Sequence, residues 1–186
     1  MPRLQPPDVS AMSAHQRRVY EAIASGPRGR VRGPLAVWLH RPGLAEHAQA
    51  LGQYCRYDSS LSPRLSELAI LTMAAWWEAP FEWWAHQPIA VQAGLDAAVA
   101  EQIRTGATPV FQQADESVVY RFVRELLESR RVSDALYQQA VQVLGTESVV
   151  DLTGIAGYYT LISMTINVFD IQPPDGSTVS FGPSAA

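Results

Sequence analysis

Residues 61–77, LSPRLSELAILTMAAWW, decide the fold of this chain. The pair Ser62-Pro63 is a typical helix start, because serine caps the first turn and proline fits within it. From Leu68 to Trp77 the segment carries no charge, and its only polar residue is Thr72. A helix that is apolar on nearly every side is a buried one. The stretch therefore predicts a central helix around which the rest of the chain packs.

The sequence on either side predicts more helices and no strands. Ser13, Asp96, Ser133 and Thr146 are expected to cap helices, and Pro88 is expected to kink one. No segment shows the alternation of a β-strand. The fold class is therefore all-α, with about eight helices. The helical segments are expected at residues 13–24, 35–39, 43–56, 62–77, 80–94, 96–104, 114–130, 133–145 and 146–169.

The whole chain, residues 1–186, is predicted to form a single domain. Residues 1–34 form an N-terminal arm and first helix, and residues 171–186 form a flexible tail that frays or lies on a partner. The loop Gly26–Pro34 holds three arginines, at alternate positions 28, 30 and 32. It is expected to be a solvated basic loop, in preference to a lid that contacts an anion.

Composition excludes several classes of function. Of the 186 residues 47% are apolar and 17% charged, with a net charge of −4, so neither global disorder nor nucleic-acid binding is expected. All 14 basic residues are arginines, which excludes Schiff-base chemistry on a lysine. The single cysteine, Cys55, forms no internal disulfide and indicates a cytoplasmic protein. Polar residues and glycines interrupt Leu152–Phe169, which predicts a buried helix and no membrane partner.

One group of residues could carry acid–base chemistry. Glu82 and His86 are spaced i and i+4 on a predicted helix, so they share one face, and Glu67 precedes them by fifteen residues. Tryptophans surround the pair, and apolar walls shift the pKa values of acids and imidazoles. A Glu–His pair there could shuttle protons near neutral pH. The alternatives are a helix-surface contact, an ordinary ion pair between Arg64 and Glu67, and tryptophans that serve as core or interface.

The sequence resembles the carboxymuconolactone decarboxylase family, which includes the AhpD-like alkylhydroperoxidases. That family implies an AhpD-like helical bundle that assembles into dimers, trimers or hexamers, with active sites at or near subunit contacts. The residues that carry the resemblance are Leu61–Leu71, Phe81–His86, Ala90 and Ala93–Leu95, with Gln16–Tyr20, Gly26–Gly29, Gly157–Leu161 and Asn167–Phe169 in the flanks.

The resemblance also bears on the kind of chemistry. The peroxidase branch carries the pattern Glu-x11-Cys-x2-Cys-x3-His. Counting back from His86 places Glu67 on the glutamate and places Ala79 and Glu82 on the two cysteines. The chain keeps the outer pair and lacks both thiols. It is therefore closer to the decarboxylase branch, in which a site without cofactor or metal acts on a lactone acid. Cys55 is expected to take no part.

The resemblance implies a role for each polar candidate. His86 would donate a proton to carbon or a hydrogen bond to the developing anion, and Glu82 would set its charge and tautomer. Glu67 would carry a second proton or orient His86. Arg64 would hold a substrate carboxylate, with a surface ion pair as the competing interpretation.

Aromatic residues are the candidates for the pocket wall. Trp83, Tyr158 and Tyr159 are predicted to bind the substrate, with plain packing as the alternative. The leading hypothesis is a lyase or isomerase of a small cyclic acid or lactone in a bacterial degradation of aromatic compounds. The alternatives are an AhpD-like peroxidase, a non-catalytic oligomer that binds a small ligand, and a metal site built from Glu67, Glu82 and His86. Five tryptophans favour a homo-oligomer.

Overall fold

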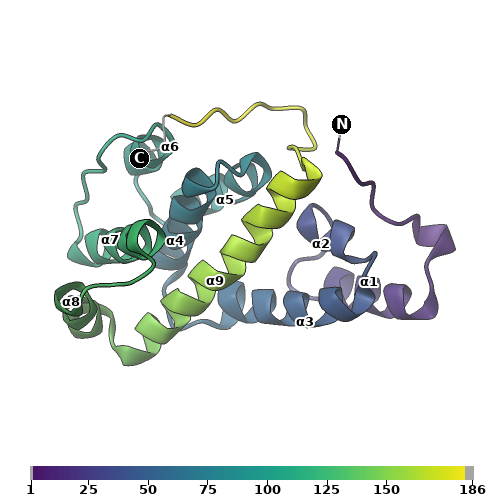
Figure 1. Ribbon diagram of the computed structural model, residues 1–186, viewed down its shortest axis with the longest axis horizontal. Helices are drawn as coiled ribbons and strands as arrows, with labels where there is room; N and C mark the ends of the chain where they lie inside the picture. Colours follow the sequence, from purple (N-terminus) through teal and green to yellow (C-terminus); the bar gives the residue numbers. More distant parts are fainter. Residues whose placement is uncertain (1, 183–186) are drawn as a thin grey trace.

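The computed structural model describes residues 2–182, which form nine α-helices, one 3₁₀ turn and one π-helical turn, and no strand. Figure 1 shows α1 to α3 at one end of the molecule, α7 and α8 at the other, and α9 running between them. The predicted all-α class is confirmed. The elements are η1 Val9–Ala11, α1 Ala14–Ser25, α2 Pro34–Trp38, α3 Pro42–Gln53, η2 Tyr54–Asp58, α4 Pro63–Trp76, α5 Pro80–Gln92, α6 Ala97–Arg104, α7 Ala114–Ser129, α8 Asp134–Leu144 and α9 Thr146–Phe169.

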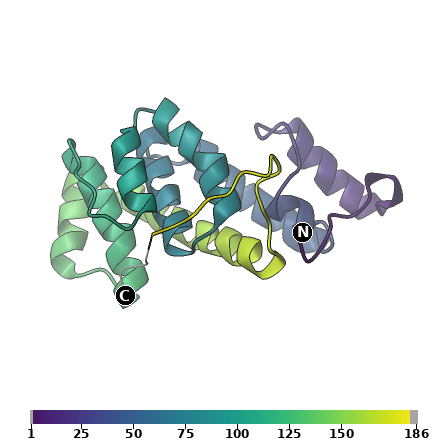
Figure 2. The ribbon, with the colours of Figure 1, turned by 90° about the horizontal axis from the view of Figure 1, so that it is seen from above.

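Helix α4 lies at the centre, as its uncharged sequence predicts. All of its residues from Leu65 to Ala74 are buried. It packs against α5, α6, α7 and α9, and Figure 2 shows it enclosed by these neighbours. Because α4 also carries Glu67, a largely buried core helix holds one of the candidate site residues. The position of Glu67 is thus set by the core.

Helix α9 is the second core element. Its 24 residues are long and apolar enough to cross a membrane by length and composition, but 61% of its most apolar window is buried inside the fold. Leu152, Ile155 and Ile166 are among the largest enclosed side chains. The interpretation of this segment as a buried helix is confirmed.

The predicted helix starts agree with the structure in position, but not every predicted capping residue forms a capping hydrogen bond. Ser13 caps α1 in a reciprocal capping box with Gln16, and Asp96 accepts a hydrogen bond from the backbone of α6. Ser62 precedes α4 without a capping hydrogen bond from its side chain. The prediction that Thr146 caps α9 is wrong. Gly145, with φ of 86°, connects α8 directly to α9, so Thr146 is the first helical residue.

The helix expected over residues 43–56 changes geometry before it ends. Helix α3 stops at Gln53 and continues as the π-helical turn η2. Asp151 on α9 contacts the first residue of this turn and the segment that follows it. It accepts hydrogen bonds from the Tyr54 hydroxyl, the Ser60 backbone N–H and the Ser60 hydroxyl, each at 2.7 Å. π-turns are rare and often occur at functional sites, and η2 carries two residues that line the cleft described below.

The described part of the C-terminal segment, residues 171–182, packs on its own chain. Asp175 accepts a hydrogen bond from Trp84 Nε1 at 2.7 Å, and the ring of Phe181 stands edge-on to Trp83 at 5.9 Å. The Gly182 N–H donates to the Arg104 carbonyl. Figure 1 shows this segment leaving α9 and reaching α6. Residues 183–186 of the predicted tail lie outside the described residues.

The loop before α2 depends on a glycine. Gly33 has φ of 58°, and a Cβ added there would overlap the edge of the buried Phe81 ring. Gly145 also has positive φ, but a Cβ there would meet nothing within 4 Å. Gly33→Ala should therefore lower the free energy of unfolding more than Gly145→Ala, by about 1–3 kcal/mol for the displaced ring. Urea unfolding measures both, and equal losses would contradict the described contact.

Candidate active site

The three polar candidates meet between α4 and α5. His86 Nδ1 lies 2.6 Å from Glu67 Oε2, and His86 Nε2 lies 2.9 Å from Glu82 Oε1. Their exposed fractions are 3% for Glu67, 4% for Glu82 and 3% for His86. A helix-surface contact would leave these side chains in solvent and would not involve a second helix. The imidazole is instead held inside the protein between two carboxylates.

This arrangement sets the charge of the imidazole. Burial by itself lowers the pKa of His86, but the charges and hydrogen bonds of Glu67 and Glu82 outweigh it and raise the pKa to about 9. His86 is therefore an imidazolium at neutral pH, and both ring N–H groups face carboxylate oxygens. The ring of Tyr159 packs edge-on against it at 5.4 Å.

An open cleft of about 700 Å³ borders this group. Glu82 and His86 form part of its wall, whereas Glu67 lies behind His86 and outside the lining. The predicted aromatic residues Trp83, Tyr158 and Tyr159 all line the cleft. The other lining side chains with aromatic or charged groups are Arg28, Arg30, Arg32, Arg56, Tyr57, Phe81 and Trp84.

Arg64 does not take part in this cleft, so its predicted role in substrate binding is wrong. Its guanidinium pairs with Asp115 at 2.7 Å and Glu116 at 2.5 Å, both on α7. The expected Arg64–Glu67 pair does not form either, because Glu67 is directed to His86. Two carboxylates neutralise Arg64 and join α4 to α7. Sequence spacing could not reveal these partners, which lie about fifty residues away.

The arginines of the loop 26–34 are functional candidates that sequence reasoning ranked second. Arg28, Arg30 and Arg32 line the cleft, which favours the alternative of a loop that contacts an anion. The Arg32 guanidinium lies 4.9 Å from the ring centre of Trp84, a cation–π contact. Burial, together with nearby Arg30 and Arg56, lowers the pKa of Arg32. The sequence signal was present, since the loop contains no acid to neutralise three arginines.

Thiol chemistry has no geometric support. Cys55 is 2% exposed within η2 and does not line the cleft. Burial raises the pKa of its thiol to about 11, so the reactive thiolate is scarce at neutral pH. The hypothesis of a metal site built from Glu67, Glu82 and His86 has no geometric support either. Among residues 2–182, no group of three or more His, Cys, Asp or Glu side chains could hold a metal ion.

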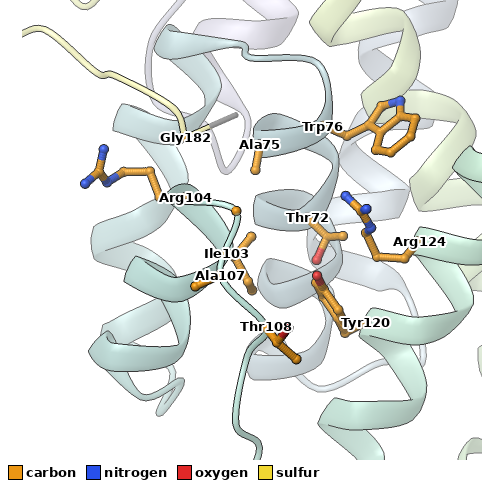
Figure 3. A pocket seen from close by; sticks show the side chains of 11 residues that line it. Thr72, Ala75, Trp76, Ile103, Arg104, Ala107, Thr108, Tyr120, Arg124 and Gly182 are labelled. Atoms are coloured by element: carbon orange, nitrogen blue, oxygen red, sulfur yellow. The ribbon is translucent and has the colours of Figure 1, made fainter. Parts of the chain in front are cut away.

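A second, smaller cavity of about 160 Å³ lies beside α4, α6 and α7. Figure 3 shows the side chains of Thr72 and Tyr120 turned toward one another there, with Arg124 beside Trp76. The Thr72 hydroxyl donates to the Leu68 carbonyl. No Asp, Glu or His side chain lines this cavity. It therefore lacks an acid–base pair, and the larger cleft is the candidate site.

Comparison with known proteins identifies the fold. No family model matches the sequence, and no curated protein matches it. A solved AhpD-core structure, an uncharacterized peroxidase-related protein from Ralstonia eutropha, has a TM-score of 0.78 at 17% identity and covers 94% of this chain and 93% of its own. An uncharacterized peroxidase-related protein from a Silicibacter species has a TM-score of 0.75 at 14% identity and covers 92% and 91%. The fold is thus AhpD-like, as the resemblance implied.

The charge state of His86 predicts a pH dependence of stability. The folded-state pKa of about 9 exceeds the usual value of 6.5, so the stabilisation is complete below pH 6.5 and is lost as the pH rises through 9. Between these values the free energy of unfolding should fall by about 1.4 kcal/mol per pH unit relative to His86→Gln, the slope for one proton. Urea unfolding at pH 6, 7.5 and 9 measures the difference. If the free energy of unfolding changed equally with pH in the wild type and in His86→Gln, this would contradict the raised pKa of His86.

Proposed function

We propose that this chain is a cofactor-free acid–base enzyme that decarboxylates or isomerises a small cyclic acid or lactone. The observation that carries the proposal is the buried His86 imidazolium, held between two carboxylates of which only Glu82 reaches the cleft. General acid–base catalysis needs a proton carrier of tuned pKa beside the substrate. Decarboxylation of a lactone acid, the reaction of the branch that the sequence resembles, is one chemistry that such a site can perform.

The geometry assigns different roles to the two glutamates. Glu67 contacts Nδ1 of His86 and does not line the cleft. It fixes the orientation of the imidazole ring and is therefore a positioning residue. Glu82 contacts Nε2 of His86 and also lines the cleft, so the proton reaches the substrate through Glu82. This differs from the sequence-based hypothesis, in which His86 itself donates to carbon. His86 instead keeps Glu82 supplied with a proton and stabilises its negative charge when the proton has left.

The proton can then be followed in both reactions. In isomerisation, the Glu82 carboxylate takes a proton from carbon beside a carbonyl, the electron pair delocalises as a dienolate, and the protonated Glu82 returns the proton to another carbon. In decarboxylation, the C–C bond to the carboxylate breaks and carbon dioxide leaves. The electron pair of the broken bond forms the dienolate. The His86 imidazolium passes a proton through Glu82 to carbon, and solvent then protonates His86 again. The arginines that line the cleft favour the anionic intermediate electrostatically.

The AhpD-like peroxidase alternative is disfavoured on chemical grounds. Peroxide reduction in that branch uses a thiolate and a resolving thiol. The corresponding positions are Ala79 and Glu82, and Cys55 is buried in η2. The peroxidase-related neighbours share the fold of this chain at a low level of identity. This likeness in fold does not identify a catalytic residue for the peroxidase alternative. A proton carrier takes the place of the thiol in the proposed site.

Assembly and location belong to the same proposal. We propose a cytoplasmic homo-oligomer that uses neither nucleic acid nor membrane partners. Helix α9 exposes Val150, Met164 and Val168, with exposed fractions of 66%, 41% and 56%. Exposed apolar side chains on one helix are suited to contact a second copy of the chain. The lone buried thiol is consistent with a reducing compartment.

Replacing the proton carriers should abolish most turnover even in the protein that remains folded. A panel of lactone acids followed by carbon dioxide release and ultraviolet absorbance should reveal a substrate, on which Glu82→Gln and His86→Gln each lower kcat by about 10²–10⁴-fold. The double variant should lose less than the product of the two losses. Cys55→Ser is the matched control and should retain activity. Wild-type rates in both variants, or no turnover of any panel member, would reject the proposed reaction.

A further inference from the structure

Arg28 is half-buried, and part of its guanidinium group is enclosed. Its guanidinium atoms Nε and Nη2 are enclosed and have no hydrogen-bond partner among residues 2–182. The same holds for the hydroxyl of Tyr158 on α9. Both residues line the cleft. Buried donors without partners are costly, and an arginine cannot shed its charge. Arg28 lies close enough to the Tyr158 hydroxyl to lower the pKa of that hydroxyl, but the enclosed atoms meet no partner in hydrogen-bond geometry among residues 2–182. The pair can therefore take an acceptor, which a bound anion would supply.

A glycine on α3 leaves space for the Arg28 guanidinium and the Tyr158 hydroxyl. Gly52 on α3 is buried, and a Cβ added there would overlap the Tyr158 hydroxyl and lie 2.7 Å from Arg28 Nη2. Glycine at this position allows the guanidinium and the hydroxyl to lie side by side against the helix backbone. Loop 26–34, helix α3 and helix α9 thus converge on one point. The pair is built by three elements that are distant in sequence.

The surroundings of the pair are positive. Arg30 and Arg32 on the same loop and Arg56 on η2 also line the cleft, whereas Glu82 is the one acidic side chain among its described lining residues. Glu82 is itself engaged with His86. Four guanidinium groups therefore face a space that offers them no free carboxylate. Arginine presents paired N–H groups that match a carboxylate in geometry.

The Tyr158 hydroxyl is suited to be a donor in this place. Burial raises its pKa well above the usual value, so it stays protonated at neutral pH. Its ring stands perpendicular to that of Tyr159 at 5.2 Å, and Tyr159 packs on His86. The aromatic contacts connect the Arg28 side of the cleft to the proton carriers. A small ring held by an acid group at Arg28 would lie along this aromatic wall.

We propose that Arg28 and Tyr158, with Arg32 and Arg56 nearby, form a carboxylate subsite that holds the acid group of the substrate. The subsite is separate from the Glu67–His86–Glu82 group and selects anionic over neutral ring compounds. It rests on the proposed function, because it names the residues that recognise the acid on which the enzyme acts. The arginine loop is then a determinant of specificity.

A binding experiment can test the subsite without turnover. The probes are 2-furoate, a cyclic carboxylate, its neutral analogue 2-furamide, and inorganic phosphate, each titrated by calorimetry and by tryptophan fluorescence. Wild-type protein should bind 2-furoate at least about tenfold more tightly than 2-furamide, as expected for charge-assisted hydrogen bonds. Arg28→Gln should weaken 2-furoate binding by about tenfold or more and leave 2-furamide unchanged. Tyr158→Phe should weaken 2-furoate by several-fold.

Stability distinguishes a binding role from a structural one. Among residues 2–182, neither the enclosed Arg28 atoms nor the Tyr158 hydroxyl meets a partner in hydrogen-bond geometry, so Arg28→Gln and Tyr158→Phe should keep the melting temperature or raise it. The control is Arg121→Gln on α7, an exposed arginine outside the cleft, which should bind 2-furoate as wild type does. Weaker 2-furoate binding together with a lower melting temperature in both variants would show a structural role and overturn the subsite.

The remaining outcomes separate the two proposals. Unchanged 2-furoate affinity in Arg28→Gln, or 2-furamide binding as tight as 2-furoate, overturns the subsite while the loss of turnover in Glu82→Gln still supports the acid–base function. Phosphate binding tighter than 2-furoate overturns the assignment to carboxylates. Arg28-dependent 2-furoate binding in a protein that turns over no lactone acid supports the subsite and rejects the proposed reaction.

Discussion

The cleft depends on one interaction, the contact of His86 with Glu67 on one side and Glu82 on the other. A buried charge is tolerated only when it is paired and hydrogen-bonded, so the three side chains require each other. Glu67 belongs to the central helix α4 and the other two to α5. The contact therefore fixes the face that α5 turns toward the cleft, and with it the positions of Trp83 and Trp84.

A second constraint places positive charge opposite this group. Asp151 contacts the start of the π-turn η2 and the segment that follows it, and Gly52 leaves space where Arg28 and Tyr158 approach the helix. The cleft thus has a proton carrier on α5 and arginines on the loop and on η2. That division suits an anionic substrate whose charge is held at one end and whose reacting carbon lies near Glu82. The AhpD-like fold supplies the frame, and the polar side chains determine the chemistry.

Sequence alone predicted the features that local pattern controls. The uncharged run in α4 indicated a core helix, and the spacing of Glu82 and His86 indicated a shared face. It did not predict contacts between distant segments. Arg64 pairs with α7, the tail packs beside Trp84, and the arginine loop lines the cleft, all through residues far apart in the chain. The π-turn was missed because its stabilising partner, Asp151, lies on α9.

The central claim is that His86 is an imidazolium at neutral pH, protonated on both ring nitrogens. Nitrogen-15 NMR of protein labelled on histidine measures this directly, with His86→Gln identifying the resonances. The account predicts two protonated ring nitrogens at pH 7 and a titration near pH 9, with a lower pKa in Glu67→Gln because one carboxylate is lost. One unprotonated ring nitrogen at pH 7, and a pKa below 7, would contradict it.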